Sequence, residues 1–285
     1  MDVSEAKKNV SEVKKDVSKD EDDWSEKSYF PPGWNIDDYV YAQNQYERDL
    51  DEQIAKILDE AGIPSVLFAE ELLDIYGVPT VTYGSTWVIA DDLIEKAYEA
   101  LRDAEIPLCA KGVDCDQVRP DRWAPYSDLH KKSAIFWRMP DPQLEPPAPD
   151  DPNYMLVTDT RIPKWWLGTG AGRFKPGSHP KNIPTPARYA EAMFYLVCRD
   201  MKGHGHSDYW ETQLNYMVSI HEDPKNDVFR ISDVAQPARR YLEFYEEGGV
   251  PFKDKWRYME RVRAELIERN ELPPLPGCGK SDRKS

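Results

Sequence analysis

The spacing of hydrophobic residues between positions 62 and 109 alternates between strand-like and helix-like. Residues 65–69 are a short, mostly apolar run typical of a buried strand, and residues 70–76 place Leu, Leu and Tyr at helical spacing. Residues 80–90 are rich in Val, Thr, Tyr and Trp, which favour strands. Residues 91–103 carry an apolar stripe at helical spacing behind two aspartates. This order of elements predicts an α/β fold.

The pattern continues on both sides of this stretch. Residues 36–61 predict a helix, because apolar residues recur at every fourth position. Residues 110–129 predict an ordered surface loop, and residues 133–139 predict another strand. The many prolines and aspartates of residues 140–152 predict a loop, and a strand is expected at residues 154–158.

Beyond residue 163 the pattern becomes helical. The Thr185-Pro186 pair is a typical helix start, because proline is tolerated in the first turn. Further helices are predicted over residues 209–221, 231–245 and 252–268. The C-terminal third is therefore a predicted helical subdomain.

Residues 3–23 repeat with a period of seven, with Val3, Val10 and Val17 at equivalent positions. Little more than two weakly apolar heptads are too few for a stable coiled coil, so we interpret this segment as a disordered or transiently helical tail. A helix that binds a partner is the alternative interpretation. We divide the chain into an acidic tail and loop at 1–33, an α/β core at 34–163, a Gly- and Pro-rich connector at 164–184, a helical subdomain at 185–272 and a polar tail at 273–285.

Composition narrows the class of partner. The chain has 37 Lys and Arg residues against 52 Asp and Glu, a formal charge of -15, which argues against nucleic acid as a partner. No apolar run approaches the roughly 20 residues of a membrane helix, and the N-terminus lacks the apolar region of a signal peptide. We therefore expect a cytoplasmic protein that does not bind membranes. The four widely spaced cysteines predict neither a disulfide framework nor a zinc site.

Several segments resemble a known protein family. YGVPT at residues 76–80 precedes a predicted strand and then ADDLIEKAYEALRDAEIP at residues 90–107. With IPTPARYAEAMFYLVCRD at residues 183–200 and ELPPLP at residues 271–276, they resemble the nucleotidyltransferase fold. The resemblance is to fungal proteins related to aminoglycoside nucleotidyltransferases and abortive-infection toxins, and it covers about half of the chain. It implies a small mixed sheet of nucleotidyltransferase type, flanked by helices and extended by a C-terminal helical subdomain.

Active members of this family bind a nucleoside triphosphate with a Gly-Gly or Gly-Ser pair and hold magnesium with an Asp-x-Asp pair on the next strand. Carboxylates two residues apart on a strand point to the same side, so that they can share a divalent cation. Aligned on the Gly-Val-Pro turn, the glycine pair corresponds to Ala69 and Glu70, and the carboxylate pair to Gly84 and Thr86. The resemblance therefore implies a degenerate site, a pseudoenzyme for which no cofactor is predicted.

Catalysis would require carboxylates at other positions. The weak candidates are Asp91, Asp92 and Asp159, with Glu70 and Glu71 beside them. Acidic residues at helix starts also have a structural explanation, because the helix dipole favours them there. An active nucleotidyltransferase, which uses magnesium with a nucleotide, is therefore the alternative hypothesis.

Three further groups of residues are candidates for binding. His204 and His206 in GHGHSD are weak metal-ligand candidates, because no third firm ligand accompanies them. The glycine-rich, locally basic segment 168–181 either binds an anion through backbone amides or connects the two domains. Trp87 and the Trp165-Trp166 pair either complete the core or line a cleft for an apolar small molecule.

These observations support three hypotheses about function. The leading hypothesis is a catalytically degenerate nucleotidyltransferase-like protein that acts by binding a small molecule or a protein partner. The first alternative is the active nucleotidyltransferase with relocated carboxylates. The second is an enzyme of different chemistry that reuses the cleft, for example to tailor a fungal metabolite.

Overall fold

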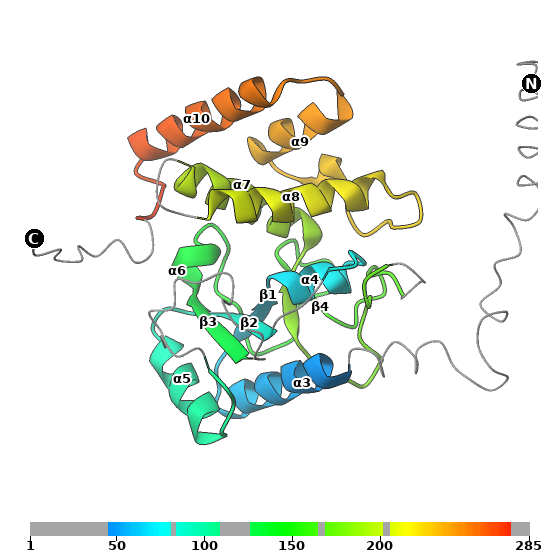
Figure 1. The fold of residues 1–285 in the computed structure, drawn as a ribbon. Coiled ribbons are helices and arrows are strands. Elements are labelled where there is room, and N and C mark those ends of the chain that lie inside the picture. Colours follow the sequence, from blue (N-terminus) through cyan, green and yellow to red (C-terminus); the bar gives the residue numbers. More distant parts are fainter. Residues whose placement is uncertain (1–44, 81–83, 109–125, 165–168, 202–205, 275–285) are drawn as a thin grey trace, which may run out of the picture. The chain divides into compact units, whose positions relative to one another are not determined.

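A mixed five-stranded sheet lies between helices in the part of the chain that the structure describes (Figure 1). The structure is a computed structural model, which describes residues 45–80, 84–108, 126–164, 169–201 and 206–274. In chain order, the elements are α3 (Gln45–Glu60), β1 (Ser65–Phe68), α4 (Glu70–Ile75), β2 (Gly84–Ile89), α5 (Ile94–Asp103), β3 (Tyr126–Lys131), α6 (Lys132–Ile135), β4 (Tyr154–Leu156), β5 (Asn182–Pro184), α7 (Pro186–Asp200), α8 (Ser207–Glu222), the 3-10 helix η2 (Ile231–Asp233), α9 (Ala238–Glu246) and α10 (Phe252–Glu268). The α/β fold with a helical C-terminal part is thus confirmed.

The sheet has the strand order β3-β2-β1-β5-β4. Strand β1 is antiparallel to β2 and parallel to β5, β2 is parallel to β3, and β4 is antiparallel to β5. Phe68 pairs with Thr86, which pairs with Asp128 on the next strand. Because paired residues on neighbouring strands point to the same side, these three side chains share one face of the sheet.

Helices α3 and α5 cover the opposite face of the sheet (Figure 1). Helix α3 turns Leu50, Ile54 and Leu58 inward at a spacing of four residues, and all three are buried. Its Asp51 accepts a 2.5 Å hydrogen bond from Ser85 of β2, which fixes the helix against this face. The alternation along β2 therefore assigns Ser85 to the α3 face and Thr86 to the other.

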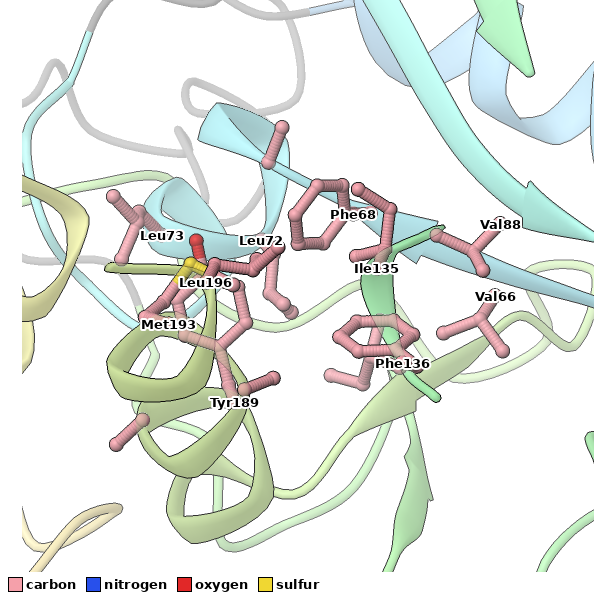
Figure 2. Close-up of a cluster of buried hydrophobic side chains, with 14 of the residues drawn as sticks. Val66, Phe68, Leu72, Leu73, Val88, Ile135, Phe136, Tyr189, Met193 and Leu196 are labelled. Carbon is pink, nitrogen blue, oxygen red and sulfur yellow. The ribbon is translucent and has the colours of Figure 1, made fainter. Parts of the chain in front are cut away.

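The C-terminal helices share one hydrophobic core with the sheet (Figure 2). The ring of Phe68 lies 5.2 Å from Phe136, 5.9 Å from Tyr189 of α7 and 6.3 Å from Trp210 of α8, measured between ring centroids. Almost every residue of α7 is buried, because the helix packs on the sheet side and also against α8, α9 and α10. An all-round buried helix of this kind is the central element of the helical layer.

Most of the predicted elements are present, and two predictions are wrong. The strands at 65–68, 84–89 and 154–156 and the helix at 252–268 lie where the pattern predicts them. However, residues 133–139 were predicted as a strand and form the end of α6 and a turn. Residues 126–129 were predicted as the end of a loop and belong to strand β3, at residues 126–131. Asp91 explains why helix α6 starts here. Its carboxylate accepts hydrogen bonds from the backbone N–H and the hydroxyl of Ser133, in the first turn of that helix.

The two remaining differences are smaller. Strand β5 has only three residues, too few for a pattern, and it lies inside the predicted connector. The predicted helix at 231–245 is divided into η2 and α9. The heptad segment lies outside the described residues. Within the described ranges, no helix combines the length and the apolar character needed to cross a membrane.

Candidate functional site

The turn between β1 and α4 is built around Ala69. This residue has φ 70° and ψ -139°, and its side chain is buried. Such backbone angles favour glycine, because a Cβ atom crowds the neighbouring carbonyl at positive φ. The Ala69 carbonyl accepts hydrogen bonds from Leu72 N and Leu73 N and so starts α4. A residue without a Cβ atom would therefore suit this turn better than alanine.

Glu70 ties this turn to the helical layer. Its Oε1 accepts a 2.7 Å hydrogen bond from the hydroxyl of Tyr209 on α8. Burial raises the pKa of Tyr209 well above its ordinary value, and the negative charge of Glu70 raises it further. Tyr209 is therefore a protonated donor at every physiological pH. The first turn of α4 is thus joined to α8 by a hydrogen bond between a carboxylate and a phenol.

Strand β2 carries Gly84 and Thr86, the positions that the sequence resemblance aligns with the carboxylate pair of nucleotidyltransferases. Asp128 on β3 lies directly beside Thr86 in the parallel pairing and is buried. It is the only carboxylate within strands β1, β2 and β3. Sequence reasoning missed this residue because it assigned residues 110–129 to a loop. The alternation of Tyr, Ser, Asp, Leu, His and Lys was the available signal.

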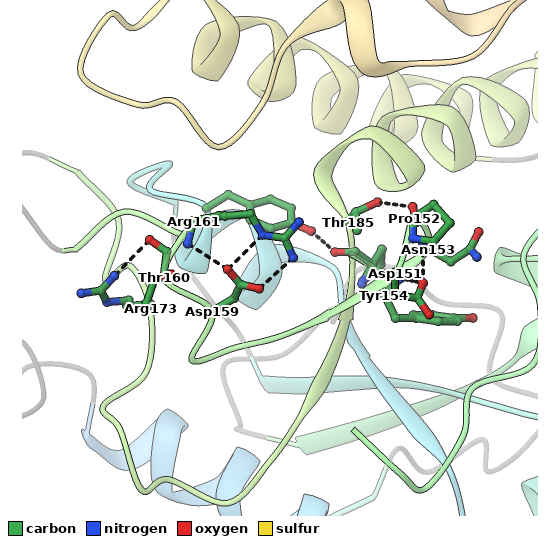
Figure 3. Close-up of polar contacts among 11 residues, drawn as sticks. Asp151, Pro152, Asn153, Tyr154, Asp159, Thr160, Arg161, Arg173 and Thr185 are labelled. Carbon is green, nitrogen blue, oxygen red and sulfur yellow. Dashed lines mark hydrogen bonds and ion pairs between the residues drawn. The ribbon is translucent and has the colours of Figure 1, made fainter. Parts of the chain in front are cut away.

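The aspartates considered for relocated catalysis have structural partners. Asp91 follows β2 and binds Ser133, and Asp92 is exposed beside it. Asp159 accepts hydrogen bonds from the backbone N–H, Nε and Nη2 of Arg161 at 2.8, 3.0 and 2.7 Å (Figure 3). Desolvation raises the pKa of Asp159, but the hydrogen bonds from Arg161 outweigh it and hold that pKa below its ordinary value.

The fold does not bring these acidic residues together. Asp91 and Asp159 follow β2 and β4 at the same end of the sheet, but β1 and β5 lie between those strands. Strands are about 4.8 Å apart, so the separation is roughly 14 Å across the sheet. Glu70 and Glu71 follow β1 at the opposite end. In the described residues, no group of three His, Cys, Asp or Glu side chains is placed to hold a metal ion.

Trp87 lies in the core beneath α3. Its side chain is fully buried, and its Nε1 donates a 2.6 Å hydrogen bond to the hydroxyl of Ser85. The indole therefore completes the core on this face. His206 lies directly before α8. Trp165, Trp166 and His204 fall outside the described residues.

The glycine-rich segment is fastened to the end of α4. The backbone N–H groups of Gly170, Ala171 and Gly172 donate to Gly77 O, Asp74 Oδ1 and Asp74 O at 2.9, 2.9 and 3.1 Å. A Cβ atom at Gly170 would lie 2.4 Å from the Asp74 carbonyl oxygen, so the contact requires glycine. These three amides are used within the fold, which favours a structural role for this part of the segment.

Lys181, one of the residues that make this segment locally basic, is buried and holds the next part of the segment on α3. The side chain of Lys181 is fully buried, its Nζ lies 3.2 Å from Glu52 Oε2, and it stands 4.2 Å above the ring of Phe174. Arg48 of α3 lies 4.4 Å from the same ring. Desolvation lowers the pKa of Lys181, while the charge of Glu52 opposes that shift. These contacts of Glu52 and Arg48 fasten the segment to helix α3.

A small hollow, with space for about one water molecule, lies between the turn after α6 and helix α7. Two buried donors in its lining, Trp137 Nε1 and Arg188 Nε, have no hydrogen-bond partner within the part of the chain that the structure describes. The other two nitrogens of Arg188 donate to Glu191 Oε2 and to the Arg138 carbonyl. The lining residues are Ile135, Phe136, Trp137, Arg138, Met139, Arg188, Glu191, Ala192 and Tyr195. A water molecule in this hollow would be within reach of polar groups of its lining.

Comparison of the chain with protein-family models, with curated proteins and with solved structures finds no match. The functional argument therefore depends on the geometry described above.

Proposed function

We propose that this protein is a catalytically degenerate nucleotidyltransferase-like protein that acts by binding a partner. The observation that carries the proposal is the environment of Thr86. Neither Thr86 nor Gly84 has a carboxylate, and Asp128 alone supplies one on the strands around them. One carboxylate holds a magnesium ion and a triphosphate much less firmly than a pair does.

The turn at Ala69 supports the relationship to the fold family. Its backbone angles suit the glycine that the resemblance places at this position, although the residue is alanine. The alternation of helix and strand from α3 to β3 also agrees with the resemblance. An ancestral glycine replaced by alanine would explain why a residue with a Cβ atom occupies this conformation.

The packing around the turn supports the loss of nucleotide binding. Glu70 is hydrogen-bonded to Tyr209, so a negative charge lies where the family offers bare backbone amides. Phe68, on the same face as Thr86, is in contact with aromatic rings from both α7 and α8. This face of the sheet is therefore used for packing against the helical layer.

Calorimetric titration of the full chain with ATP and GTP, each with and without Mg²⁺, tests the proposal. We expect no heat of binding for either nucleotide. Tight, magnesium-dependent binding would show that the site is functional and would overturn the proposal. Incubation with radiolabelled nucleotides and a mixture of aminoglycosides and proteins supplies an independent readout, and transfer of label would have the same consequence.

A gain-of-site variant makes the negative result informative. Thr86→Asp places a second carboxylate about 5 Å from Asp128, because the two positions are paired on adjacent strands. We expect this variant to be less stable than the wild type in EDTA and to regain stability with Mn²⁺, while the wild type does not respond. Thr80→Asp, outside the strands, is the matched control. A wild type that Mn²⁺ stabilises as strongly as the variant would contradict the proposed loss of metal binding.

A further inference from the structure

Helix α10 is packed against the helical layer along only part of its length. Its buried residues are Met259, Val262 and Leu266, whereas none of the residues from Phe252 to Tyr258 is buried. The helix contacts α7 and α9 and lies on the outer side of the layer (Figure 1). About two turns at the start of α10 are therefore only partly covered by the described fold.

Phe252, at the start of α10, is the most exposed large hydrophobic residue in the described ranges. It is 60% exposed, compared with 50% for Ile267 and 45% for Leu144. Its ring lies 5.8 Å from the ring of Trp256, which follows one turn later and is half-buried. Aromatic side chains are enriched in protein interfaces, and neighbouring exposed ones often mark an interaction surface. Two aromatic rings thus lie side by side on the uncovered part of α10.

Charged residues of both signs flank these two rings. Glu246 and Glu247 stand at the end of α9, before the loop that joins it to α10. They pair with His221 and Arg240, but 48% and 45% of their side chains remain exposed. Lys253, at the other end of the loop, is exposed as well. The loop therefore has negative charge at its start and positive charge at its end.

The charge of this region differs from that of the whole chain. Residues 246–257 read EEGGVPFKDKWR, with three acidic and three basic residues and a net charge of zero, whereas the chain has a formal charge of -15. Charges more than about 8 Å apart are largely screened at physiological ionic strength, so the charges at a contact decide whether two chains repel each other. A second copy of this chain can therefore approach residues 246–257 without net repulsion.

The order of the charges makes this surface complementary to itself. We propose that residues 246–257 are a self-association surface through which two copies of this chain form a symmetric dimer. With the two surfaces antiparallel about a two-fold axis, Glu246 of each copy lies opposite Lys253 of the other. The rings of Phe252 and Trp256 then meet at the centre and the charged residues surround them, as in many interface hot spots. The inference is independent of the proposed function, because this surface does not include the turn at Ala69.

Sedimentation velocity of the full chain, from about 1 μM to about 1 mM, tests the inference. We expect a monomer–dimer equilibrium within this range. Phe252→Ser removes the central ring and weakens the dimer at least about tenfold. Ile267→Ser, on the same helix and also exposed, is the matched control and leaves the equilibrium unchanged. Both residues are exposed, so neither substitution disturbs the core of the fold.

A charge exchange tests the antiparallel arrangement. Lys253→Glu and Glu246→Lys each place like charges opposite one another, so each variant alone forms a weaker dimer than the wild type. An equimolar mixture of the two variants restores association, because every contact in the mixed dimer again joins opposite charges.

Three results would overturn the inference. The first is a chain that remains monomeric over the whole concentration range. The second is a Phe252→Ser variant that dimerises as strongly as the wild type, which would assign association to another surface. The third is a mixture of the two charge variants that associates no better than either variant alone. None of these results affects the nucleotide titration, so failure of this inference and failure of the proposed function are distinguishable.

Discussion

The hydroxyl of Tyr209 on α8 donates a 2.7 Å hydrogen bond to Glu70 Oε1 in the first turn of α4. These residues are 139 positions apart in the chain. Their contact joins the helical layer to the turn that follows β1, the region where a nucleotidyltransferase keeps its phosphate-binding glycines. The same pair therefore contributes to packing and places a carboxylate in the turn that we propose to be a degenerate phosphate-binding site.

Removal of the Tyr209 hydroxyl tests how much its hydrogen bond to Glu70 contributes to the free energy of unfolding. Hydrogen bonds to charged groups contribute about 1.5–3 kcal/mol, and partial exposure of Glu70 reduces that value. We expect Tyr209→Phe to lower the free energy of unfolding by about 1–2 kcal/mol, measured by urea denaturation. Tyr258→Phe, which loses a bond to the neutral Pro237 carbonyl, is the control and should cost less. An equal or larger loss in the control would contradict a special role for the Tyr209–Glu70 contact.

Ala69 provides a prediction with an unusual sign. At φ 70° and ψ -139° alanine is strained by about 1–3 kcal/mol, whereas glycine is not. Glycine loses more backbone entropy on folding, which offsets part of the gain. We expect Ala69→Gly to raise the free energy of unfolding by about 1 kcal/mol. Ala100→Gly, inside helix α5, should lower it by about the same amount, and a loss in both variants would show that Ala69 is not strained.

The sequence was sufficient for elements that have a strong period and a clear boundary. Helix α10 was predicted at the positions where it lies, because its apolar spacing is regular and Pro273 follows it. Strand β3 was missed, since its Asp128 and His130 look like loop residues, and their burial depends on the strand beside them. The helical α6 was missed for a similar reason: the hydrogen bonds from Ser133 to Asp91 join residues 42 positions apart.

The candidate site was predictable only in part. The sequence identified Ala69, Glu70, Gly84 and Thr86 as the positions of interest, but the contact that fixes Glu70 comes from Tyr209, far along the chain. Residues near in sequence can be assigned by periodicity. Contacts between α4 and α8 depend on how the helical layer packs on the sheet, which a single sequence does not encode in any local pattern.

His130 predicts how stability depends on pH. Burial lowers the pKa of His130 to about 4, while the unfolded chain binds the proton near the ordinary value of 6.5. Between these two values the unfolded state holds more protons, so stability falls as the pH is lowered from 6.5 towards 4. We expect the wild type to lose about 2 kcal/mol more than His130→Gln between pH 7 and pH 5 in urea denaturation.

The quantity to compare is the change in the free energy of unfolding with pH. Comparing this change, rather than the free energy at one pH, removes the destabilisation that the substitution itself causes. His221→Gln is the control, because His221 is paired with Glu246 on the surface. It should retain the steep dependence of the wild type. Equal slopes for the wild type and His130→Gln over this range would show that His130 takes up a proton in the folded protein.

Two tryptophans whose indole nitrogens are buried provide the last prediction. The indole N–H of Trp210 donates to Asp200 Oδ2 at 2.7 Å, whereas Trp137 Nε1, in the lining of the hollow beside α7, has no hydrogen-bond partner among the described residues. An unmet buried donor costs about 1–3 kcal/mol, which Phe in place of Trp137 recovers while losing part of the ring contact with Tyr195. We therefore expect Trp137→Phe to change the free energy of unfolding by less than about 1 kcal/mol, and Trp210→Phe to lower it by about 2–4 kcal/mol, because Asp200 also loses a donor. A large loss in Trp137→Phe would instead show that a bound water or small ligand accepts its N–H in solution.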